Sequence, residues 1–592
     1  MINKFKIICS KKHIKLITIL FFGLIFGAIV ELTGIGAIPL FVMLILDVEK
    51  VKSKTPDFIN LDFLNHLSVN EIAFFGAILL TIIFFVKNIF LGILIYFEGS
   101  VYKKMRMDLS SRLFKLYTSV SYAFHLKTNP SILLRNIEGE TSQSISVIQS
   151  YLSLVREFLV LSVIFSLLVY VDPVISFIAF LFLSLFVFTF YLLTNKKLHL
   201  NGKIMQFMRA EITKHIIQSF GVIKEVKILG KESFLNKIDL KNRYIFEGAF
   251  FKNYFLSSLP RLFLEIIVIS TIASITILFV FLERELIAMI PLLSLLVVAA
   301  VRLMPSFTTI SGGLSRIKSL TPSINLVVDE ILKLEMLKSK TIQNSIETIK
   351  FNKEIKFINL SFKYEGVENF AINNFNLSIK SGQKIGIIGT SGAGKSTFVD
   401  LMLGLLQPSS GHIEVDQTNI NKNIRSWQNL IGYVPQDIYL LDDSIKNNIA
   451  FGVSEDLLNK KNLDLAIKFA QLENFISDLP NGIETMIGNR GVRISGGQRQ
   501  RIGIARALYN DQKILIFDEA TNSLDLENEK KIIEEIFLLD KSKTLILITH
   551  RHETVYDCDQ IFLIKDGVLL DQGKYDYLND KYNLNAFVQK NK

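Results

Sequence analysis

A glycine-rich run in the second half of the chain has the composition of a phosphate-binding loop. Residues 384–388 are mostly apolar and predict a buried strand that leads directly into this run. In such loops glycines turn backbone N–H groups toward phosphate oxygens, a lysine reaches the β and γ phosphates, and a hydroxyl at the helix start binds Mg²⁺. We assign the phosphates to Lys395 and the metal to Ser396. The predicted loop comprises Gly389, Thr390, Ser391, Gly392, Ala393, Gly394, Lys395, Ser396 and Thr397.

A pair of carboxylates follows a second apolar stretch. Residues 514–517 predict a strand, and Asp518 and Glu519 come at its carboxyl end. In a nucleotide site Asp518 would hold Mg²⁺ through water, and Glu519 would orient and polarise the attacking water. A solvated acidic turn is the alternative interpretation, but it leaves the upstream glycine loop unexplained.

A third motif, residues 494–501 (Ile-Ser-Gly-Gly-Gln-Arg-Gln-Arg), opens a predicted helix with small residues. Free N–H groups and the positive end of the helix dipole would therefore face an anion. With this motif the chain resembles the ABC ATPase family, although Ile494 replaces the usual Leu. The resemblance implies that the anion is the γ-phosphate of ATP on a partner subunit, so that two chains enclose two ATP molecules. The residues it assigns to this contact are Ser495, Gly496, Gly497 and Gln498.

Four further positions match the family's elements in the right order. The resemblance implies that Tyr364 stacks on adenine and that Gln436 senses Mg²⁺ and contacts the membrane domain. It also implies that Asp525 links the two sites of the dimer and that His550 contacts the γ-phosphate. One departure is Asn489, where exporters usually carry Glu. Because the catalytic positions are intact, a homodimer is the simplest assembly, and a heterodimer is the alternative.

The elements that position these residues belong to the second of two predicted domains. The chain has 592 residues, of which 50% are hydrophobic and 20% charged, and a mean hydropathy of +0.37, which is too apolar for an ordinary soluble enzyme. We expect a mixed fold with an all-α transmembrane domain over 1–330, a linker over 331–350 and an α/β P-loop ATPase domain over 351–592. Six apolar stretches are long enough to cross a hydrocarbon core of about 30 Å: 16–46, 72–97, 151–171, 174–193, 262–282 and 286–301.

The charge pattern predicts how these spans are oriented. Basic residues crowd the long segments after the second and fourth spans, so those segments, both termini and the ATPase domain are expected in the cytoplasm. The first span follows a basic run but is too long for a signal peptide. The net charge of +11 would also suit a soluble ABC ATPase acting on nucleic acid, but six apolar spans argue against a nucleic-acid partner. Cys9 and Cys558 are far apart in the sequence and imply no disulfide.

Six spans ahead of one ATPase domain resemble half-transporter exporters, which place coupling helices near 122–130 and 221–234. Segments 259–265 and 299–305, and Val30-Glu31 ahead of Pro39, further resemble bacterial flippases that turn lipid-linked oligosaccharides across the inner membrane. This resemblance implies a lipid-linked or amphipathic anionic cargo and contact with membrane lipids. An exporter of drugs, peptides or simple lipids is the alternative. The first external loop, 56–67, is expected to be either an interfacial helix or a solvated loop.

Three cations are predicted to bind the cargo because they fall where a charge is costly. Lys87 is the only charge between positions 72 and 97, and Arg261 and Arg302 border the last two spans. A cation at the centre of a membrane helix costs about 2.5–3.5 kcal/mol. At about 1.5 Å per residue, Lys87 lies about 22 Å, Arg302 about 25 Å and Arg261 about 33 Å from the outer ends of their spans. We therefore expect them to bind the pyrophosphate of a lipid-linked sugar.

The alternative interpretation of these cations requires no cargo. The two arginines would extend to inner headgroups. Lys87 would pair with Glu31, Glu157 or Glu265.

Overall fold

The structure, a computed structural model, divides into two compact units. It describes residues 2–46, 68–171, 173–281, 290–341, 348–488, 494–519, 531–532, 534–535 and 542–589. The first unit comprises Met1–Val120 and Phe124–Ser339, and the second comprises Ser121–Ala123 and Lys340–Lys592. We call them the helical unit and the α/β unit. Helix α11 (Ile290–Thr341) extends into the predicted linker, so residues 331–341 are helical.

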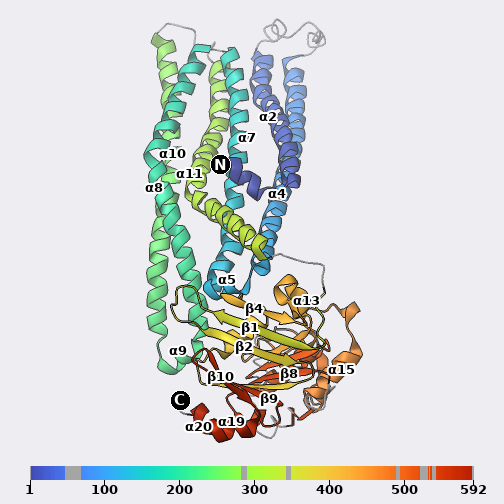
Figure 1. Ribbon diagram of the computed structural model, residues 1–592. Helices are drawn as coiled ribbons and strands as arrows, with labels where there is room; N and C mark the ends of the chain where they lie inside the picture. Colours follow the sequence, from blue (N-terminus) through green and yellow to red (C-terminus); the bar gives the residue numbers. More distant parts are fainter. Residues whose placement is uncertain are drawn as a thin grey trace. The chain divides into compact units, whose positions relative to one another are not determined.

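Long helices dominate the helical unit. Among the described residues six helices have between 31 and 52 residues each. They run alongside one another in Figure 1, where α8 packs on α10 and α2 packs on both α4 and α7. The other five are α2 (Lys11–Leu46), α4 (Val69–Ser119), α7 (Thr141–Val171), α8 (Pro173–Gly221) and α10 (Glu232–Phe281), and the short α1 (Ile2–Ile8) precedes them.

Three segments of the described chain have the length and composition needed to cross a membrane. They are Lys11–Ile45, Val69–Ser119 and Pro130–Ser166. Helix α8 contains the predicted span 174–193, whereas α10 and α11 contain only part of the spans 262–282 and 286–301, because 282–289 lie outside the described residues. The predicted number of six spans stays a prediction.

Two local features explain how the long helices begin and pack. Ser68 caps α4, because its Oγ accepts a hydrogen bond from the backbone N of Glu71 at 3.3 Å while its own N donates to Glu71 Oε2 at 2.8 Å. Gly202 brings α8 against α11, since a Cβ at this position would lie 2.0 Å from the carbonyl oxygen of Ser319. Only glycine allows this approach.

Short helices occupy the segments between the long ones. The first predicted coupling segment contains α5 (Tyr122–Lys127), and the second contains α9 (Ile223–Leu229), which ends at Gly230 with a φ of +61°. Their role in coupling stays a prediction. Between α6 (Pro130–Leu134) and α7, residues Arg135–Glu140 form a π-helical turn, η2.

The α/β unit contains two sheets. One is antiparallel with the order β2-β1-β4-β5, and the other has the order β10-β9-β3-β8-β7-β6. In the second sheet β9, β3, β8, β7 and β6 are parallel neighbours, and β10 is antiparallel to β9. The strands are β1 (Glu354–Phe362), β2 (Ile372–Lys380), β3 (Lys384–Gly389), β4 (Ser410–Val415), β5 (Thr418–Asn419), β6 (Ile431–Val434), β7 (Ile514–Asp518), β8 (Thr544–Ile548), β9 (Gln560–Lys565) and β10 (Val568–Gly573).

Helices lie beside these sheets (Figure 1). Two clusters of buried apolar side chains form the core of the unit. Trp427 is fully buried, and its indole N–H donates to the carbonyl oxygen of Met402 at 2.7 Å. The two helices that matter for the site are α12 (Lys395–Met402) and α17 (Gly496–Leu508). The others are α13 (Ile424–Gln428), α14 (Ile445–Ile449), α15 (Lys460–Phe469), α16 (Glu473–Ser477), α19 (Tyr575–Tyr582) and α20 (Leu584–Gln589), with short 3₁₀ turns η4 (Ile420–Lys422), η5 (Glu455–Leu457), η6 (Gly482–Glu484) and η8 (His552–Val555).

Candidate functional site

Four neighbouring parallel strands place the predicted nucleotide residues at one edge of the sheet. The order β3-β8-β7-β6 brings the glycine loop after β3 next to the residue after β8, and then to the ends of β7 and β6. In parallel sheets the carboxyl ends of the strands form a ligand-binding crevice. The strand order, which joins segments more than 150 residues apart, therefore creates the site.

The glycine loop leads from β3 into α12 as predicted from its sequence. Gly392 and Gly394 have φ values of +76° and +97°, and a Cβ on Gly394 would lie 2.4 Å from a backbone oxygen. The buried ammonium of Lys395 donates to the carbonyl oxygens of Gly389 and Thr390 at 2.9 and 3.0 Å. Burial lowers the pKa of Lys395, and the nearby carboxylates of Glu519 and Asp518 oppose that shift.

The carboxylate of Glu519 is contacted on both oxygens. Gln436, just beyond β6, donates its amide N–H to Glu519 Oε2 at 2.7 Å. His550, after β8, places its Nε2 at 2.5 Å from Oε1. Glu519 is buried and has a φ of +50°, a conformation that non-glycine residues rarely adopt outside functional or strained sites. Three residues predicted from separate motifs thus meet at one carboxyl group.

Asp518 has two neighbours that sequence reasoning missed. The hydroxyl of Tyr433 in β6 donates to Asp518 Oδ2 at 3.3 Å. Burial, followed by repulsion from Glu519, raises the pKa of Asp518. Burial and the charge of Asp518 raise the pKa of Asp400 in α12 to about 6. No motif singled out Asp400 in the sequence, although it lies in the first helix after the glycine loop, five residues beyond Lys395.

Tyr364 lies beside the glycine loop. Its hydroxyl is 3.1 Å from Thr397 Oγ1, and its ring packs edge-on against Phe362 with centroids 5.0 Å apart. The side chain is 38% exposed, so one part of the ring packs on the protein while another part is accessible. This position suits a ring that stacks on a planar base.

The signature motif begins α17. Ser495 is the N-cap, because its Oγ accepts a hydrogen bond from the backbone N of Gln498 at 3.2 Å and its own N donates to Gln498 Oε1 at 2.8 Å. This capping box could have been identified from the Ser-x-x-Gln spacing. Ser495 and Gly496 are exposed, so the N-terminus of α17 is accessible to another molecule.

Several predicted residues lie outside what the structure describes. Asp525, Asn489 and the first external loop, 56–67, belong to this group. Arg261 and Arg302 fall within α10 and α11, but their side chains are likewise not described. Both cysteines, one in each unit, are buried, and burial raises the pKa of the Cys558 thiol to about 12, which disfavours a reactive thiolate.

Lys87 is the one predicted cargo cation whose side chain is described. Its ammonium lies 4.4 Å from the ring centre of Phe84 in α4. It also packs on α2, because a Cβ on Gly34 would be 3.0 Å from Lys87 Nζ. Glu31 is buried on the same face of α2, one turn before Gly34. The predicted alternative partner Glu157 is 3.3 Å from Arg156.

Comparison with known families and proteins agrees with this architecture. The family model described as ABC transporter matches residues 372–522, which include the glycine loop, the signature and both carboxylates. An ATP-dependent lipid A-core flippase of Wigglesworthia glossinidia brevipalpis is 30% identical over 506 residues, which are 83% of this chain and 84% of that protein. A leukotoxin translocation ATP-binding protein of a Pasteurella haemolytica-like species is 42% identical over 231 residues, 39% of this chain and 32% of that protein.

A solved structure shows the same fold over nearly the full length. The structure of a bacterial Atm1-family ABC exporter with ATP bound has a TM-score of 0.76 and 22% identity, and the match covers 97% of this chain and 98% of that one. The helical unit and the α/β unit are therefore arranged in sequence as in an ABC exporter. Together with the 506-residue similarity, this shows that the chain belongs to the ABC transporter family, as an exporter-type half-transporter that couples ATP hydrolysis to transport.

Proposed function

We propose that the chain works as a homodimeric, ATP-driven flippase that moves a lipid-linked oligosaccharide or a related anionic glycolipid across the bacterial inner membrane. One observation carries this proposal. The similarity to a lipid A-core flippase extends over 506 residues, which is far longer than the α/β unit. It therefore includes much of the helical unit, the part of an exporter that meets the cargo.

The rival cargo classes are drugs, peptides and simple lipids. The leukotoxin translocation protein has the higher identity, but its 231 matched residues are fewer than the α/β unit contains. Exporters that carry different classes of cargo can have similar ATPase domains. The shorter match therefore gives less weight to a protein or peptide cargo than the longer match gives to a lipid.

The donor set at the edge of the sheet fits ATP with Mg²⁺. Gly392 and Gly394 of the loop have positive φ values, a backbone conformation that lets N–H groups gather around an anion, and Lys395 at the start of α12 would contact a phosphate bound there. Ser396, Gln436 and Asp518 supply the hard oxygen ligands that Mg²⁺ prefers. When bound, the metal would neutralise charge on the phosphates.

Glu519 is assigned to water activation. Its oxygens are oriented by Gln436 and His550, so a water placed between Glu519 and the γ-phosphate would meet a fixed acceptor. His550 is partly exposed, at 34% of its side chain, and we assign it to contact with the γ-phosphate. Tyr364 is assigned to the adenine.

The exposed start of α17 is assigned to a second subunit. Ser495, Gly496, Gly497 and Gln498 lie at a helix N-terminus, where N–H groups and the dipole attract an anion. In a homodimer each chain would supply this helix to the ATP on the other, with Asp525 near the junction. Two composite sites result from one kind of chain.

Charge in the membrane half supports an anionic cargo. Lys87 keeps an ammonium against Phe84 and Gly34 within an apolar stretch of α4, and an intramembrane cation rarely persists without a task. Arg261 and Arg302 fall on two other helices at comparable depth. We assign the three to the pyrophosphate of the cargo, with the ATP-binding domain and both termini in the cytoplasm.

The experiment is reconstitution into liposomes with a fluorescent lipid diphosphate-linked glycan. ATP should drive its appearance in the opposite leaflet, and the Glu519→Gln chain in matched liposomes should give no more flipping than empty vesicles. ATP-dependent accumulation of a peptide with no movement of the glycolipid would reject the proposal in favour of peptide export.

A further inference from the structure

A cavity lined by both polar and apolar side chains lies in the helical unit, among α7, α8, α10 and α11. Its volume is about 460 Å³, within the range of small-ligand sites. A second cavity of about 260 Å³ shares Gly312 and Arg316 with it. The two cavities are therefore adjacent at Gly312 and Arg316. We call them together the inner cavity.

The lining of the inner cavity suits an acidic sugar. Hydroxyl and amide groups dominate its polar side, including Ser146, Asn253 and Ser319, and two arginines, Arg209 and Arg316, outnumber the single carboxylate of Glu247. Hydroxyls and amides both donate to and accept from sugar hydroxyls. Guanidinium groups bind phosphate and carboxylate with directed hydrogen bonds.

The depth of the cavity also fits a headgroup rather than a lipid tail. At about 1.5 Å per residue, Arg316 lies about 39 Å from the first residue of α11 and Arg209 about 54 Å from the first residue of α8. Both distances exceed a hydrocarbon core of about 30 Å. The inner cavity is therefore distinct from the Lys87 region and lies on the side predicted to be cytoplasmic.

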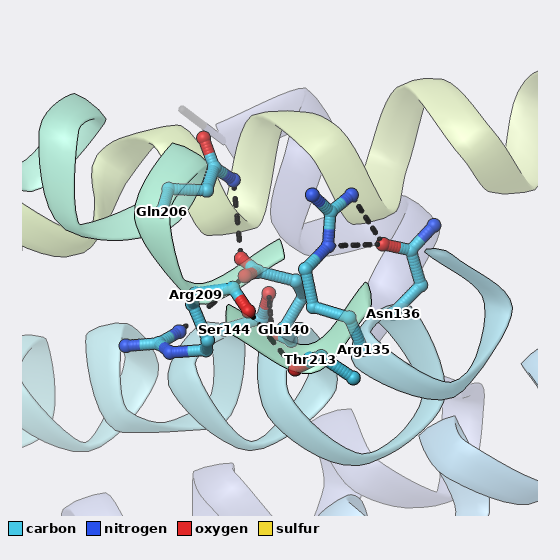
Figure 2. Close-up of polar contacts among 7 residues, drawn as sticks. All are labelled: Arg135, Asn136, Glu140, Ser144, Gln206, Arg209 and Thr213. Carbon is cyan, nitrogen blue, oxygen red and sulfur yellow. Dashed lines mark hydrogen bonds and ion pairs between the residues drawn. The ribbon is translucent and has the colours of Figure 1, made fainter. Parts of the chain in front are cut away.

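Arg209 both lines the cavity and pairs with a buried acid. Its Nη1 is 3.3 Å from Oε1 of Glu140, whose side chain is fully buried, while 24% of the arginine side chain is exposed. The other carboxylate oxygen of Glu140 accepts from Gln206 Nε2 at 3.1 Å (Figure 2). Within the described residues the guanidinium thus contacts Glu140 through one nitrogen, a geometry weaker than a bidentate pair.

Glu140 belongs to the π-helical turn η2, which joins several helices. In that turn Asn136 donates from its amide to the hydroxyl of Tyr117 in α4 at 2.9 Å, and Tyr117 donates to Glu330 in α11 at 3.2 Å. Figure 2 shows Arg135 and Asn136 on the same turn as Glu140. Such turns often occur at functional positions in helices. A change at Arg209 therefore acts on a turn bonded to α4 and, through Tyr117, to α11.

We propose that the inner cavity binds an acidic, hydroxyl-rich sugar headgroup, with Arg316 and Arg209 on its negative group, and that Arg209 turns from Glu140 to the ligand when the cavity fills. Ligand binding in the inner cavity would thereby remove the contact of Arg209 with Glu140 in the π-helical turn. That the sugar is carried on a lipid rests on the proposed function; the binding chemistry does not.

If the Arg209–Glu140 pair has only a structural role, the expected effect of Glu140→Gln on ligand binding is the opposite. If Arg209 only neutralises Glu140, Glu140→Gln loosens the unit and weakens any binding in the cavity. If Glu140 competes with the ligand for Arg209, the same variant releases the arginine and tightens binding. Arg316→Gln tests the site separately, because Arg316 is exposed and lies outside the Glu140 network.

The test measures equilibrium binding to the full chain, checked for folding by gel filtration and ATP hydrolysis. The probes are glucose 1-phosphate with glucose as its neutral match, and lipid A in phosphatidylcholine vesicles with plain vesicles as its match. We expect Arg316→Gln and Arg209→Gln to weaken binding of the charged probes at least threefold, and Glu140→Gln to tighten binding of glucose 1-phosphate at least threefold. Lys203→Gln, an exposed cation on α8 away from the cavity lining, should change neither binding nor ATP hydrolysis.

The two probes distinguish a lipid-borne ligand from a soluble one, and the variants test whether the inner cavity is the binding site. Arginine dependence with lipid A alone identifies a lipid-borne headgroup, and dependence with glucose 1-phosphate alone identifies a soluble sugar phosphate; either supports the cavity. Binding of both probes that ignores Arg316 and Arg209, or a weaker binding in a folded Glu140→Gln chain, overturns the proposal. Since no step requires flipping, a failed flipping assay with intact binding would reject the proposed function and leave the cavity standing.

Discussion

The two units of this transporter encode their functions in different ways. In the α/β unit the functional residues occur in short contiguous motifs at the ends of β3, β6, β7 and β8, and the strand order brings them together. In the helical unit the charged residues that we assign to cargo are isolated in the sequence, and charged neighbours there come from distant segments, as α8 does at Glu140. A motif can be recognised alone, whereas an isolated charge acquires meaning only from its surroundings. The catalytic residues of the α/β unit can therefore be predicted from sequence motifs, whereas the cargo of the helical unit cannot.

The largest expected effect falls in the α/β unit, at Glu519. We expect Glu519→Gln to lower ATP turnover by about 100-fold or more, because a positioned general base contributes roughly that much, while ATP still binds. Glu473→Gln, an exposed carboxylate in the first turn of α16, is the matched control and should hydrolyse ATP normally. Near-normal turnover of Glu519→Gln would show that another group polarises the water.

A mixing experiment asks whether the α/β unit is complete in one chain. Lys395→Ala should weaken ATP binding roughly tenfold or more, since hydrogen bonds to charged groups contribute about 1.5–3 kcal/mol, and Gly496→Asp should place a negative charge against the γ-phosphate of the partner's ATP. A mixed dimer of the two variants retains one intact composite site. We therefore expect ATP hydrolysis in the mixture well above that of either variant alone. Equal, low activity in all three samples would count against two independent composite sites.

Packing of the helical unit can be tested at its closest approach. Gly202→Ala puts a Cβ 2.0 Å from the carbonyl oxygen of Ser319, and overpacking of this kind costs about 1–3 kcal/mol. Gly248 in α10 has open space around its Cβ position, so Gly248→Ala is the control and should be neutral or slightly stabilising. Thermal denaturation followed by gel filtration in detergent should show a lower midpoint for Gly202→Ala only. Equal midpoints would mean that α8 and α11 are not held this close.

The contrast between the units also explains what the sequence could predict. The glycine loop, Asp518 and Glu519 and the signature were predictable because strand and helix signals flank each motif. Tyr433 and Asp400 were missed because neither belongs to a motif, and only the strand order β7-β6 places Tyr433 on Asp518.

In the helical unit the sequence predicted apolar spans and costly cations, but not the π-helical turn or the inner cavity. Glu140 reads as one more surface acid in a polar segment until Arg209 and Gln206 are brought to it from about seventy residues away. No local periodicity encodes such a contact, because it depends on how α8 packs beside the turn. Because contacts in the helical unit depend on how its helices pack, the cargo could be inferred from the sequence only through isolated charges.

The smallest effect concerns Asp400. Because burial and Asp518 raise its pKa to about 6 from the usual value of 3.8, the folded state binds this proton more tightly than the unfolded state does. The free energy of unfolding should therefore fall as pH rises between about 4 and about 7, and Asp400→Asn should remove this dependence. The group is partly exposed, so we expect about 1 kcal/mol rather than the full value of its shift.

Trp427 allows this effect to be measured in the right unit. It is the only tryptophan of the chain and is fully buried in the α/β unit, so its fluorescence follows unfolding there without a signal from the helical unit. Measurements without nucleotide and with EDTA keep metal binding out of the titration. A wild-type and an Asp400→Asn chain with parallel pH profiles would show that Asp400 titrates normally.

We propose that the α/β unit supplies the energy for transport and that charges in the helical unit select an anionic lipid. The most direct measurement compares the wild-type chain with a chain carrying Lys87→Gln, Arg261→Gln and Arg302→Gln in the same liposomes, recording ATP hydrolysis and flipping of a lipid diphosphate-linked glycan together. We predict that flipping falls at least tenfold while ATP hydrolysis stays within about twofold, since a desolvated cation–phosphate contact contributes about 1.5–3 kcal/mol. Unchanged flipping of the lipid diphosphate by the triple variant would show that these three cations do not bind the cargo.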